Sequence, residues 1–443
     1  MPDLPKGVTN PNQLAMDSSL EGVFQYMSSM NAGSCDVVGF PGYPYLAQLA
    51  QRTEFRIPCV SLADEMTGKW ISVSAQGGAD NSDKCQEIEK RLIELGVKEV
   101  LNKSIMTDAI FGRSQIYIDM GVSSNGKKNP LLIDESTIKK GSLKGFKVIE
   151  PFWTTPNGYD TIDPTSEFFF VPREWLIMGT AVHHTRLMTM ISHELPDILK
   201  PSYNFGGLSM LQMLEPYVKN WTDTRNNVHD ILEHFSHLGL KTNLMAELSG
   251  ATWDNVYKRL EKYTNQGRNR EVFAIDKDTE DFFMLNVPLS TLDALQGQAL
   301  DFMALPAQMP LVKLFGQTPS GLNASSKEEM DCWYDRVASK QEKLLRPILD
   351  KIIKLVQLDL YGKIDESITF RFNPLQQENP MDAAMVRKTN ADTGAVLIAS
   401  GVISADEERE RINLDEYSGY DNLGSELAPD IDEIEPEQQN GDE

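Results

Sequence analysis

Apolar and polar positions along the chain follow a helical period in some stretches and a strand period in others, which predicts a mixed α+β fold. Residues 82–112 carry a helical pattern in which Ser82 is the expected N-cap. Residues 115–189 hold short runs rich in β-branched and aromatic side chains, separated by turn sequences. These runs, QIYIDM, FKVIEPF, EFFFVP and EWLIMG, predict a mainly β region.

The second half of the chain is mostly helical in its pattern. An apolar stripe over residues 209–239 predicts one long helix, bent at Pro216, and residues 240–287 read as a small mixed segment. A long helix is expected from about residue 327, with a kink at Pro347 because proline lacks an N–H and clashes with the preceding turn. The run SITFRFNP predicts a half-buried strand, and Ser404 to Asp406 are expected to cap the last helix.

Length and charge narrow the class of protein. The chain has 443 residues and a net charge of −23, and residues 406–443 contain fifteen acids and two arginines. An acidic chain is a poor candidate for tight DNA binding, which needs basic surface. No apolar run reaches the ~20 residues that span a bilayer, and the first residues do not read as a secretory signal, so we expect no membrane association.

The sequence contains few motifs that are typical of catalytic or metal-binding sites. It contains no phosphate-binding loop, no nucleophile elbow and no zinc-spaced cysteines, so we predict no catalytic residue, no metal and no cofactor. One alternative is a two-histidine phosphoesterase, for which His183 with Thr185 and His234 with Ser236 are the candidate pairs. The other reading of these residues is ordinary helix and loop histidines.

A basic patch and a polar segment stand out. The patch comprises Lys258, Arg259, Lys262, Arg268 and Arg270, against a single glutamate, and it reads either as a solvated helix face or as a docking surface. Residues 307–326 are rich in Pro, Gly, Asn and Ser and lie between two helical patterns, which predicts a mobile connector.

The order of these parts, together with one local motif, resembles the portal (head-to-tail connector) proteins of tailed bacteriophages. The stretch LVKLFGQTPSGLNASSKEEMDCWYD at residues 311–335 is similar to a portal-family pattern. Its matching residues are Lys313, Gly316, Pro319, Gly321, Leu322, Asn323, Ala324, Asp331, Tyr334 and Asp335. Gln341, Leu345 and the GGLS turn at residues 206–209 support the resemblance, which covers roughly residues 38–420.

The resemblance implies a portal fold with an α/β wing, a helical stem, a small α/β clip, a long kinked wing helix and a helical crown-side region. The implied parts are an N-terminal arm (1–37), the wing (38–208, β-rich over 115–189), the first stem helix (209–239), the clip (240–287), the second stem helix (288–306), the tunnel loop (307–326), the kinked wing helix and strand (327–373), the crown-side helices (374–420) and an acidic tail (421–443).

The resemblance also implies a function. Such a protein forms a homo-oligomeric ring, expected to be a dodecamer, at the capsid portal vertex of the virion, and it assembles in the host cytoplasm. Double-stranded DNA passes through the ring during packaging and ejection. Implied partners are the large terminase, head–tail adaptor or tail proteins, and the major capsid and scaffolding proteins. A non-portal scaffold or adaptor of the virion is the remaining alternative.

The resemblance also implies roles for the polar segment and for the basic patch. The polar segment would face the channel through Gln308, Lys313, Gln317, Ser320, Asn323 and Ser325. One Lys313 per subunit would make a ring of positive charge, unless this lysine is held in an ion pair or lies outside the lumen. The basic patch would belong to the clip and meet DNA, the terminase or an adaptor.

Overall fold

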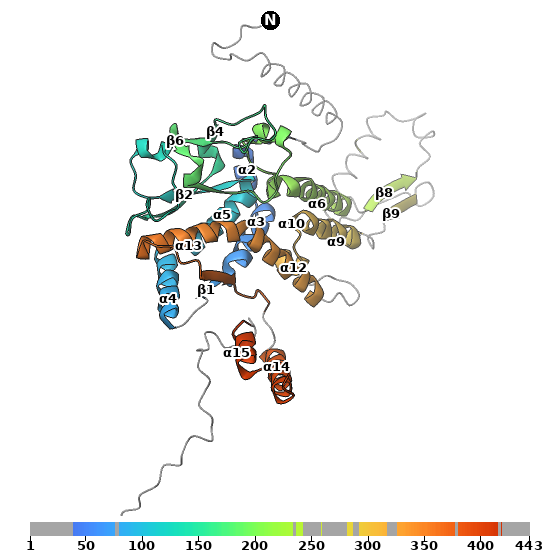
Figure 1. Cartoon of the computed structure of the whole chain (residues 1–443). Helices are drawn as coiled ribbons and strands as arrows, with labels where there is room; N and C mark the ends of the chain where they lie inside the picture. Colours follow the sequence, from blue (N-terminus) through green and yellow to red (C-terminus); the bar gives the residue numbers. More distant parts are fainter. Residues whose placement is uncertain are drawn as a thin grey trace, which may run out of the picture. The chain divides into compact units, whose positions relative to one another are not determined.

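The computed structural model of the protein describes residues 39–75, 79–233, 236–241, 258, 281–286, 292–316, 326–376, 380–414 and 418 (Figure 1). The chain divides into two compact units. The first unit contains Met1–Glu215 and Pro306–Glu443, and the second contains Pro216–Leu305. We describe each unit by itself. Helices and small sheets occur together, which confirms the predicted α+β class.

Four helices form the first part of the first unit: α2 (Tyr43–Leu49), α3 (Thr53–Gly68), α4 (Ala79–Glu94) and α5 (Val97–Phe111). α3 packs against α5 through buried side chains such as Phe55, Leu62 and Leu101. The helical pattern predicted over residues 82–112 is confirmed, as two helices, but the N-cap predicted at Ser82 is wrong. The pattern breaks at Gly96, whose φ of 61° interrupts an α-helix, and the first helix begins at Ala79.

The β-rich region is confirmed as two three-stranded antiparallel sheets. The strands are β2 (Ser114–Asp119), β3 (Gly145–Ile149) and β7 (Leu187–Met190) in the order β3-β2-β7, and β4 (Thr154–Asn157), β5 (Glu174–Ile177) and β6 (Thr180–His183) in the order β4-β5-β6. A buried cluster that includes Tyr117, Trp175 and Leu187 draws on both sheets. The predicted strand EFFFVP is wrong, because Phe170 has a φ of 48°, which strand backbone does not adopt.

Backbone segments meet closely where the GGLS turn follows the sheets. A Cβ placed on Gly112 would lie 2.2 Å from the carbonyl oxygen of Gly207, and a Cβ placed on Gly207 would lie 2.2 Å from the carbonyl oxygen of His193. The Gly207 amide also donates to the Gly112 carbonyl at 2.7 Å. Only glycine fits at these two positions, so the turn holds the end of α5 against the segment after β7.

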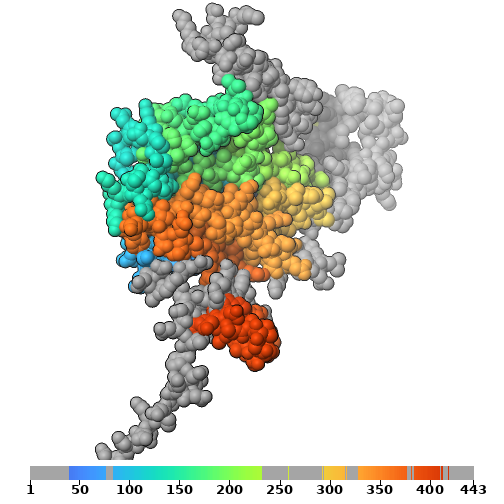
Figure 2. All heavy atoms as spheres, viewed as in Figure 1, coloured from blue at the N-terminus to red at the C-terminus, as the bar shows by residue number. Residues whose placement is uncertain are grey.

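The long helix of the first unit has three parts: α12 (Ser326–Lys340), a π-helical turn over Gln341–Leu345, and α13 (Arg346–Tyr361). Pro347 lies in the first turn of α13. The sequence predicted a kink at Pro347, and the structure has a change of helix type directly before it. At this position the missing N–H of proline leaves no α-helical hydrogen bond unmade within α13. Figure 2 shows this segment (orange) sharing one face of the first unit with the β-rich region (green).

The π turn keeps one face of the long helix buried. Its buried residues are spaced by four: Trp333, Val337, Gln341 and Leu345. Four residues of α-helix rotate by roughly 400°, about 40° more than a full circle, so a strict spacing of four drifts around an α-helix. A π turn holds more residues per turn and therefore corrects the drift. The long helix is followed by β10 (Ile368–Phe372), which pairs antiparallel with β1 (Ile71–Ala75) and confirms the predicted strand.

The second unit contains most of α6 (Met210–Glu233), the antiparallel pair β8 (Ser236–Lys241) and β9 (Asp281–Asn286), and α9 (Leu292–Phe302). The predicted helix over residues 209–239 is therefore too long. Leu238 and Leu240 flank Gly239 in an alternating pattern that suits a strand, and glycine disfavours helix. Residues 242–257 and 259–280 of the predicted clip lie outside the described residues.

Two helices close the described chain, α14 (Pro380–Ala399) and α15 (Ala405–Leu414). The predicted cap at Ser404 is confirmed. The Ser404 amide donates to Glu407 Oε2 at 2.8 Å, and the Glu407 amide donates to Ser404 Oγ at 3.2 Å. This reciprocal pair is a capping box, which satisfies two backbone donors at the start of α15.

Candidate functional site

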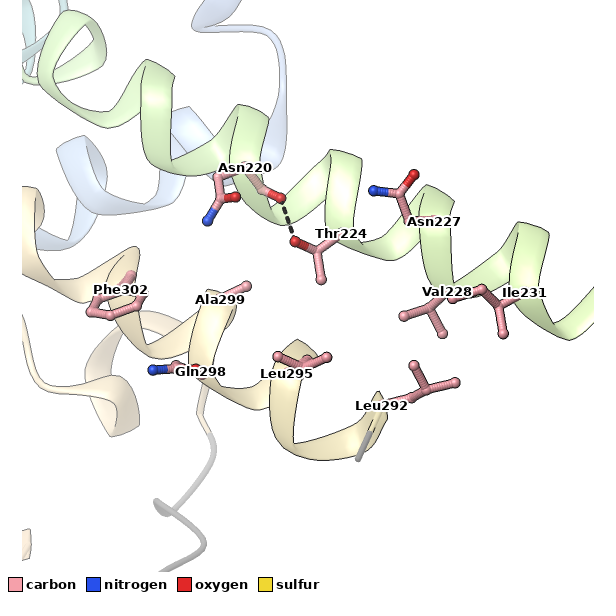
Figure 3. Close-up of a pocket in the computed structure, with 10 residues that line it drawn as sticks. All are labelled: Asn220, Thr224, Asn227, Val228, Ile231, Leu292, Leu295, Gln298, Ala299 and Phe302. Atoms are coloured by element: carbon pink, nitrogen blue, oxygen red, sulfur yellow. Dashed lines mark hydrogen bonds between the residues drawn. The ribbon is translucent and has the colours of Figure 1, made fainter. Parts of the chain in front are cut away.

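An open groove of about 340 Å³ lies between α6 and α9 in the second unit (Figure 3). Its walls are Asn220, Thr224, Asn227, Val228 and Ile231 from α6, and Leu292, Leu295, Gln298, Ala299 and Phe302 from α9. Figure 3 shows these side chains in the space between the two helices. Of the lining side chains from α6, Val228 and Ile231 belong to the apolar stripe that the sequence predicted over residues 209–239.

The chemistry of the groove suits packing and not catalysis. None of its ten lining side chains is charged. Val228 and Ala299 at its floor are 8% and 5% exposed, while Leu295 and Phe302 at its rim are 50% and 48% exposed. Large apolar side chains left half-exposed around a neutral groove are typical of a surface that a protein partner covers.

The predicted tunnel loop begins as an ordered, packed segment. Two short helices, α10 (Ala304–Ala307) and α11 (Leu311–Phe315), precede residues 317–325. Ala307, Met309 and Leu314 are buried. The expectation that all of residues 307–326 form a mobile connector is therefore wrong over its first part, because these apolar side chains anchor residues 307–315 in the first unit.

Two predicted channel residues lie in this packed part. Gln308 is exposed with a φ of 53°, and its carbonyl accepts from Arg336 at 3.4 Å. Lys313 is half-buried, donates to Glu65 of α3 at 2.7 Å, and lies 5.9 Å from the ring of Tyr334. Burial lowers the pKa of Lys313, but the hydrogen bond and the charge of Glu65, together with the nearby Tyr334, outweigh this effect, and the net pKa is raised. Lys313 thus occupies the ion pair that the sequence left open as an alternative.

The remaining predicted site residues are mostly not described. Gln317, Ser320, Asn323 and Ser325 lie outside the described residues, as do Arg259, Lys262, Arg268 and Arg270 of the basic patch. Lys258 is helical and exposed. The channel and docking roles of these residues therefore stay predictions.

Only the first of the two histidine motifs of the phosphoesterase alternative lies within the described residues. His183 ends β6, and its Nδ1 lies 3.0 Å from Thr185 Oγ1, which also accepts from the Leu131 amide at 2.8 Å. Burial lowers the pKa of His183, Glu174 raises it, and Arg186 lowers it further. The hydroxyl and ring nitrogen of this motif are thus already engaged within the fold. His234 of the second motif lies outside the described residues.

The structure also contains a buried polar cluster that the sequence did not reveal. Asp108 of α5 is 2% exposed and accepts hydrogen bonds from the Ser192 amide at 3.2 Å and from the Ser192 hydroxyl. Burial raises the pKa of Asp108, and the hydrogen bonds from Ser192 and the charge of Lys340, the last residue of α12, oppose this rise. Nothing in the local sequence around Asp108 marks it as buried. The spacing of four from Trp333 to Leu345 is the available signal for the π turn beside it.

Within the described residues, no group of three or more histidine, cysteine, aspartate or glutamate side chains could hold a metal ion. No described helix is long and apolar enough to cross a membrane.

Comparison with known proteins identifies the family. Residues 43–396 match the family described as phage portal protein, and this match includes both compact units. The chain therefore belongs to the phage portal protein family.

Curated relatives are distant. The chain is 24% identical to the anti-CBASS protein Acb1 of Sphingomonas paeninsulae over 84% of its own length, and it spans 61% of that protein. It is 24% identical to an uncharacterized protein of Haemophilus influenzae, over 86% of each chain. A second anti-CBASS protein Acb1, from Caulobacter, is also 24% identical, and the chain spans 56% of it.

Two solved structures have low similarity to this chain. A chain from the neck of the native GTA particle, computed with C12 symmetry, is 14% identical, with a TM-score of 0.43 over 88% of this chain and 98% of that one. An HK97 family phage portal protein from Corynebacterium diphtheriae is 11% identical, with a TM-score of 0.36 over 74% of this chain and 94% of that one.

Proposed function

We propose that this chain forms the ring-shaped portal vertex of a phage capsid and that double-stranded viral DNA passes through the ring during packaging and ejection. The observation that carries the proposal is the family match over residues 43–396. Rings close when each subunit offers two unlike, complementary faces, and portal proteins act as such rings. We expect a dodecamer.

The α6–α9 groove supports this proposal as part of a contact between subunits. Leu295 and Phe302 are half-exposed at its rim, and its lining is uncharged. Burial of apolar area yields about 25 cal/mol per Å², so covering such side chains favours association. The groove is therefore proposed to be covered by an adjoining subunit of the ring.

Residues 317–325 are proposed to face the channel. Gln317, Ser320, Asn323 and Ser325 would offer neutral polar contacts along which phosphates can slide. The pairing of Lys313 with Glu65 removes a free cation from the base of this segment. An acidic chain of net charge −23 would repel DNA within the Debye length, which is about 10 Å at 0.1 M salt, and would limit sticking. Deletion of residues 318–325 tests this role, and normal packaging by rings that carry the deletion would contradict it.

The basic patch is proposed to dock acidic surface of the large terminase during packaging and of a head–tail adaptor or tail protein afterwards, or to line the channel exit. Charge reversal at Arg268 and Arg270 should impair packaging or docking while rings still form, because rim charges govern encounter more than folding. Unchanged packaging and docking by that double variant would refute the assignment. Contacts with the major capsid and scaffolding proteins in the virion, after assembly in the host cytoplasm, complete the proposal.

Ring formation is tested on the purified full chain by light scattering coupled to size exclusion and by negative-stain microscopy. Phe302→Asp should prevent assembly, because it places a carboxylate in the apolar contact. Ile162→Asp is the matched control, since Ile162 is 68% exposed and lies in the first unit away from the groove lining. Loss of assembly in both variants, or in neither, would contradict the role of the groove.

A further inference from the structure

A long ordered loop connects β2 to β3 in the first unit. This β2–β3 loop spans residues 120–144, and its only regular element is the short 3-10 turn Ser124–Lys128. Connections of more than about 15 residues without secondary structure are uncommon in compact domains and are usually either functional or disordered. This loop is ordered, because its side chains Leu131, Ile138 and Leu143 are buried in the fold. It is therefore a candidate for a function of its own.

A buried carboxylate of α13 fixes the base of the loop. Asp359 is 5% exposed, and its Oδ1 accepts from the Leu143 amide at 2.9 Å while its carbonyl accepts from the Gly141 amide at 3.0 Å. Arg91 of α4 pairs with Asp359 at 3.0 Å and donates to the Leu143 carbonyl at 3.3 Å. Figure 2 shows the loop (turquoise) next to the end of α13 (orange). The last part of the loop is thus held against two helices.

Five lysines project from this fixed base. Lys139, Lys140 and Lys144 are exposed, while Lys127 and Lys128 are half-buried. Among the residues that the structure describes, none of the five takes part in an ion pair. The loop contains two acids and no arginine, so it has a local balance of +3 in a chain whose net charge is −23. The β2–β3 loop is therefore a concentration of positive charge on a predominantly acidic chain.

The acids nearest to the lysines in sequence are engaged elsewhere. Asp134 accepts from two backbone amides of the loop itself, at 2.8 and 2.9 Å, and Glu135 accepts from the Ile364 amide at 3.3 Å. Asp119, at the end of β2, pairs with Lys147 of β3 at 2.8 Å. These carboxylates therefore hold the loop and its flanking strands in place and are not paired with the five ammonium groups.

The composition of the loop indicates which polyanion it would bind. Protein–protein interfaces are depleted of lysine and have an apolar centre, whereas the one large apolar side chain exposed on this loop is Leu132. Nucleic-acid phosphates are contacted largely by lysine and arginine, and such contacts carry no sequence information. The absence of arginine also removes the side chain that most often reads guanine. The lysines therefore suit a phosphate backbone better than an acidic protein.

We propose that the β2–β3 loop is a sequence-independent binding surface for the phosphate backbone of double-stranded DNA, separate from residues 317–325 and from the basic patch. The loop would hold a duplex against the β-rich region, while the acidic remainder of the chain repels it and confines the contact. The surface belongs to the single chain, so the proposal does not rest on ring assembly.

The salt dependence of DNA binding by the full chain tests the proposal. A short fluorescent duplex is titrated with protein from about 50 to about 200 mM salt, and anisotropy gives the affinity. Each phosphate contact adds about 0.9 to the slope of log K against log salt, so five contacts predict a slope of about −4.5. The triple variant Lys128→Gln, Lys139→Gln and Lys140→Gln should make the slope shallower by about 2.7, because it removes three of the five contacts.

A second triple variant, Lys69→Gln, Lys103→Gln and Lys388→Gln, is the matched control. These lysines are exposed and lie outside the loop, so the control makes the same change in net charge and should leave the slope unchanged. Both triple variants are also measured in a chain that carries Arg268→Glu and Arg270→Glu, which removes the other proposed basic contact. The difference between the two triple variants should persist there.

Three results would overturn the proposal. The first is an equal slope for the loop variant and the control. The second is wild-type binding that is absent at low salt or does not weaken as salt is raised. The third is displacement of the duplex by polyglutamate as readily as by unlabelled duplex of equal total charge, which would assign the loop to an acidic protein partner instead.

Discussion

The shifted pKa values of Asp108 and His193 predict an unusual dependence of stability on pH, which Asp108→Asn should expose. Burial raises the pKa of Asp108 from its ordinary 3.8 to about 7, with Ser192 and Lys340 opposing the rise. Burial, with Lys340 and Lys343, lowers the pKa of His193 from 6.5 to about 4. The two groups titrate across the same window with opposite consequences for folding.

The signs follow from proton binding. Between about pH 4 and pH 7 the native state holds a proton on Asp108 that the unfolded state has lost, so this contribution is full below pH 4 and disappears as pH rises through 7. Between about pH 4 and pH 6.5 the unfolded state holds a proton on His193 that the native state lacks. That contribution is full above pH 6.5 and is lost as pH falls through 4.

The two contributions to the free energy of unfolding are comparable in size. A difference of one in pKa between the native and unfolded states corresponds to about 1.4 kcal/mol. Asp108 contributes a fall of about 4 kcal/mol as pH rises from 4 to 7, and His193 contributes a gain of about 3 kcal/mol. In the wild type the two nearly cancel. In Asp108→Asn only the gain remains, so the free energy of unfolding of the variant relative to the wild type should rise by about 4 kcal/mol between pH 4 and pH 7.

Urea denaturation at fixed protein concentration, at half-unit steps from pH 4 to pH 7, measures this difference. His193→Gln is the complementary variant and should show a stability that falls with rising pH. A difference between wild type and Asp108→Asn that is constant with pH would refute the assignment of a raised pKa to Asp108.

Three other substitutions test local features of the fold. Gly207→Ala should prevent folding or destabilise the protein by several kcal/mol in thermal denaturation, because its Cβ would lie 2.2 Å from a carbonyl oxygen. Gly297→Ala is the control and should be neutral or stabilise by up to about 1 kcal/mol, because a Cβ there would meet nothing within 4 Å. Lys313→Met should lower stability by no more than about 1 kcal/mol, since the pair is partly exposed at 34% and 20%, and a larger loss in urea denaturation would contradict that reading. Ser404→Ala removes one half of the capping box and should cost about 1 kcal/mol, seen as faster amide exchange in the first turn of α15 only.

The spacing of apolar residues and the positions of turn and capping residues in the sequence were sufficient to predict the elements with strong local signals. The β-rich region, the strand at Ile368–Phe372 and the cap at Ser404 were predicted because alternation and capping residues act over a few positions. The long helix was predicted from its apolar spacing. A kink was predicted at Pro347, whereas the helix is interrupted by the π turn over Gln341–Leu345, directly before α13.

The features that escaped prediction depend on residues far apart in the chain. Asp108 meets Ser192 only after α5 and the segment after β7 have packed together. Arg113 reads as a surface residue, yet it is 0% exposed, stacks 4.1 Å from the Trp175 ring and donates to the Asn204 carbonyl at 2.7 Å. Local sequence carries no information about such partners.

The candidate site was predicted in part for the same reason. The apolar stripe of α6 was visible in the sequence, but the groove that α6 forms with α9 was not. The polar composition of residues 307–326 suggested a free loop, although Met309 and Leu314 bury its first part. The pairing of Lys313 was left open because Glu65 lies 248 positions away in the sequence.

Negative-stain microscopy of the purified full chain tests the central claim most directly. We expect annular particles with a central hole for the wild type and for Ile162→Asp, and dispersed single chains for Phe302→Asp. A wild-type preparation that shows no rings at any protein concentration would contradict the assignment of this chain as the channel of a portal vertex.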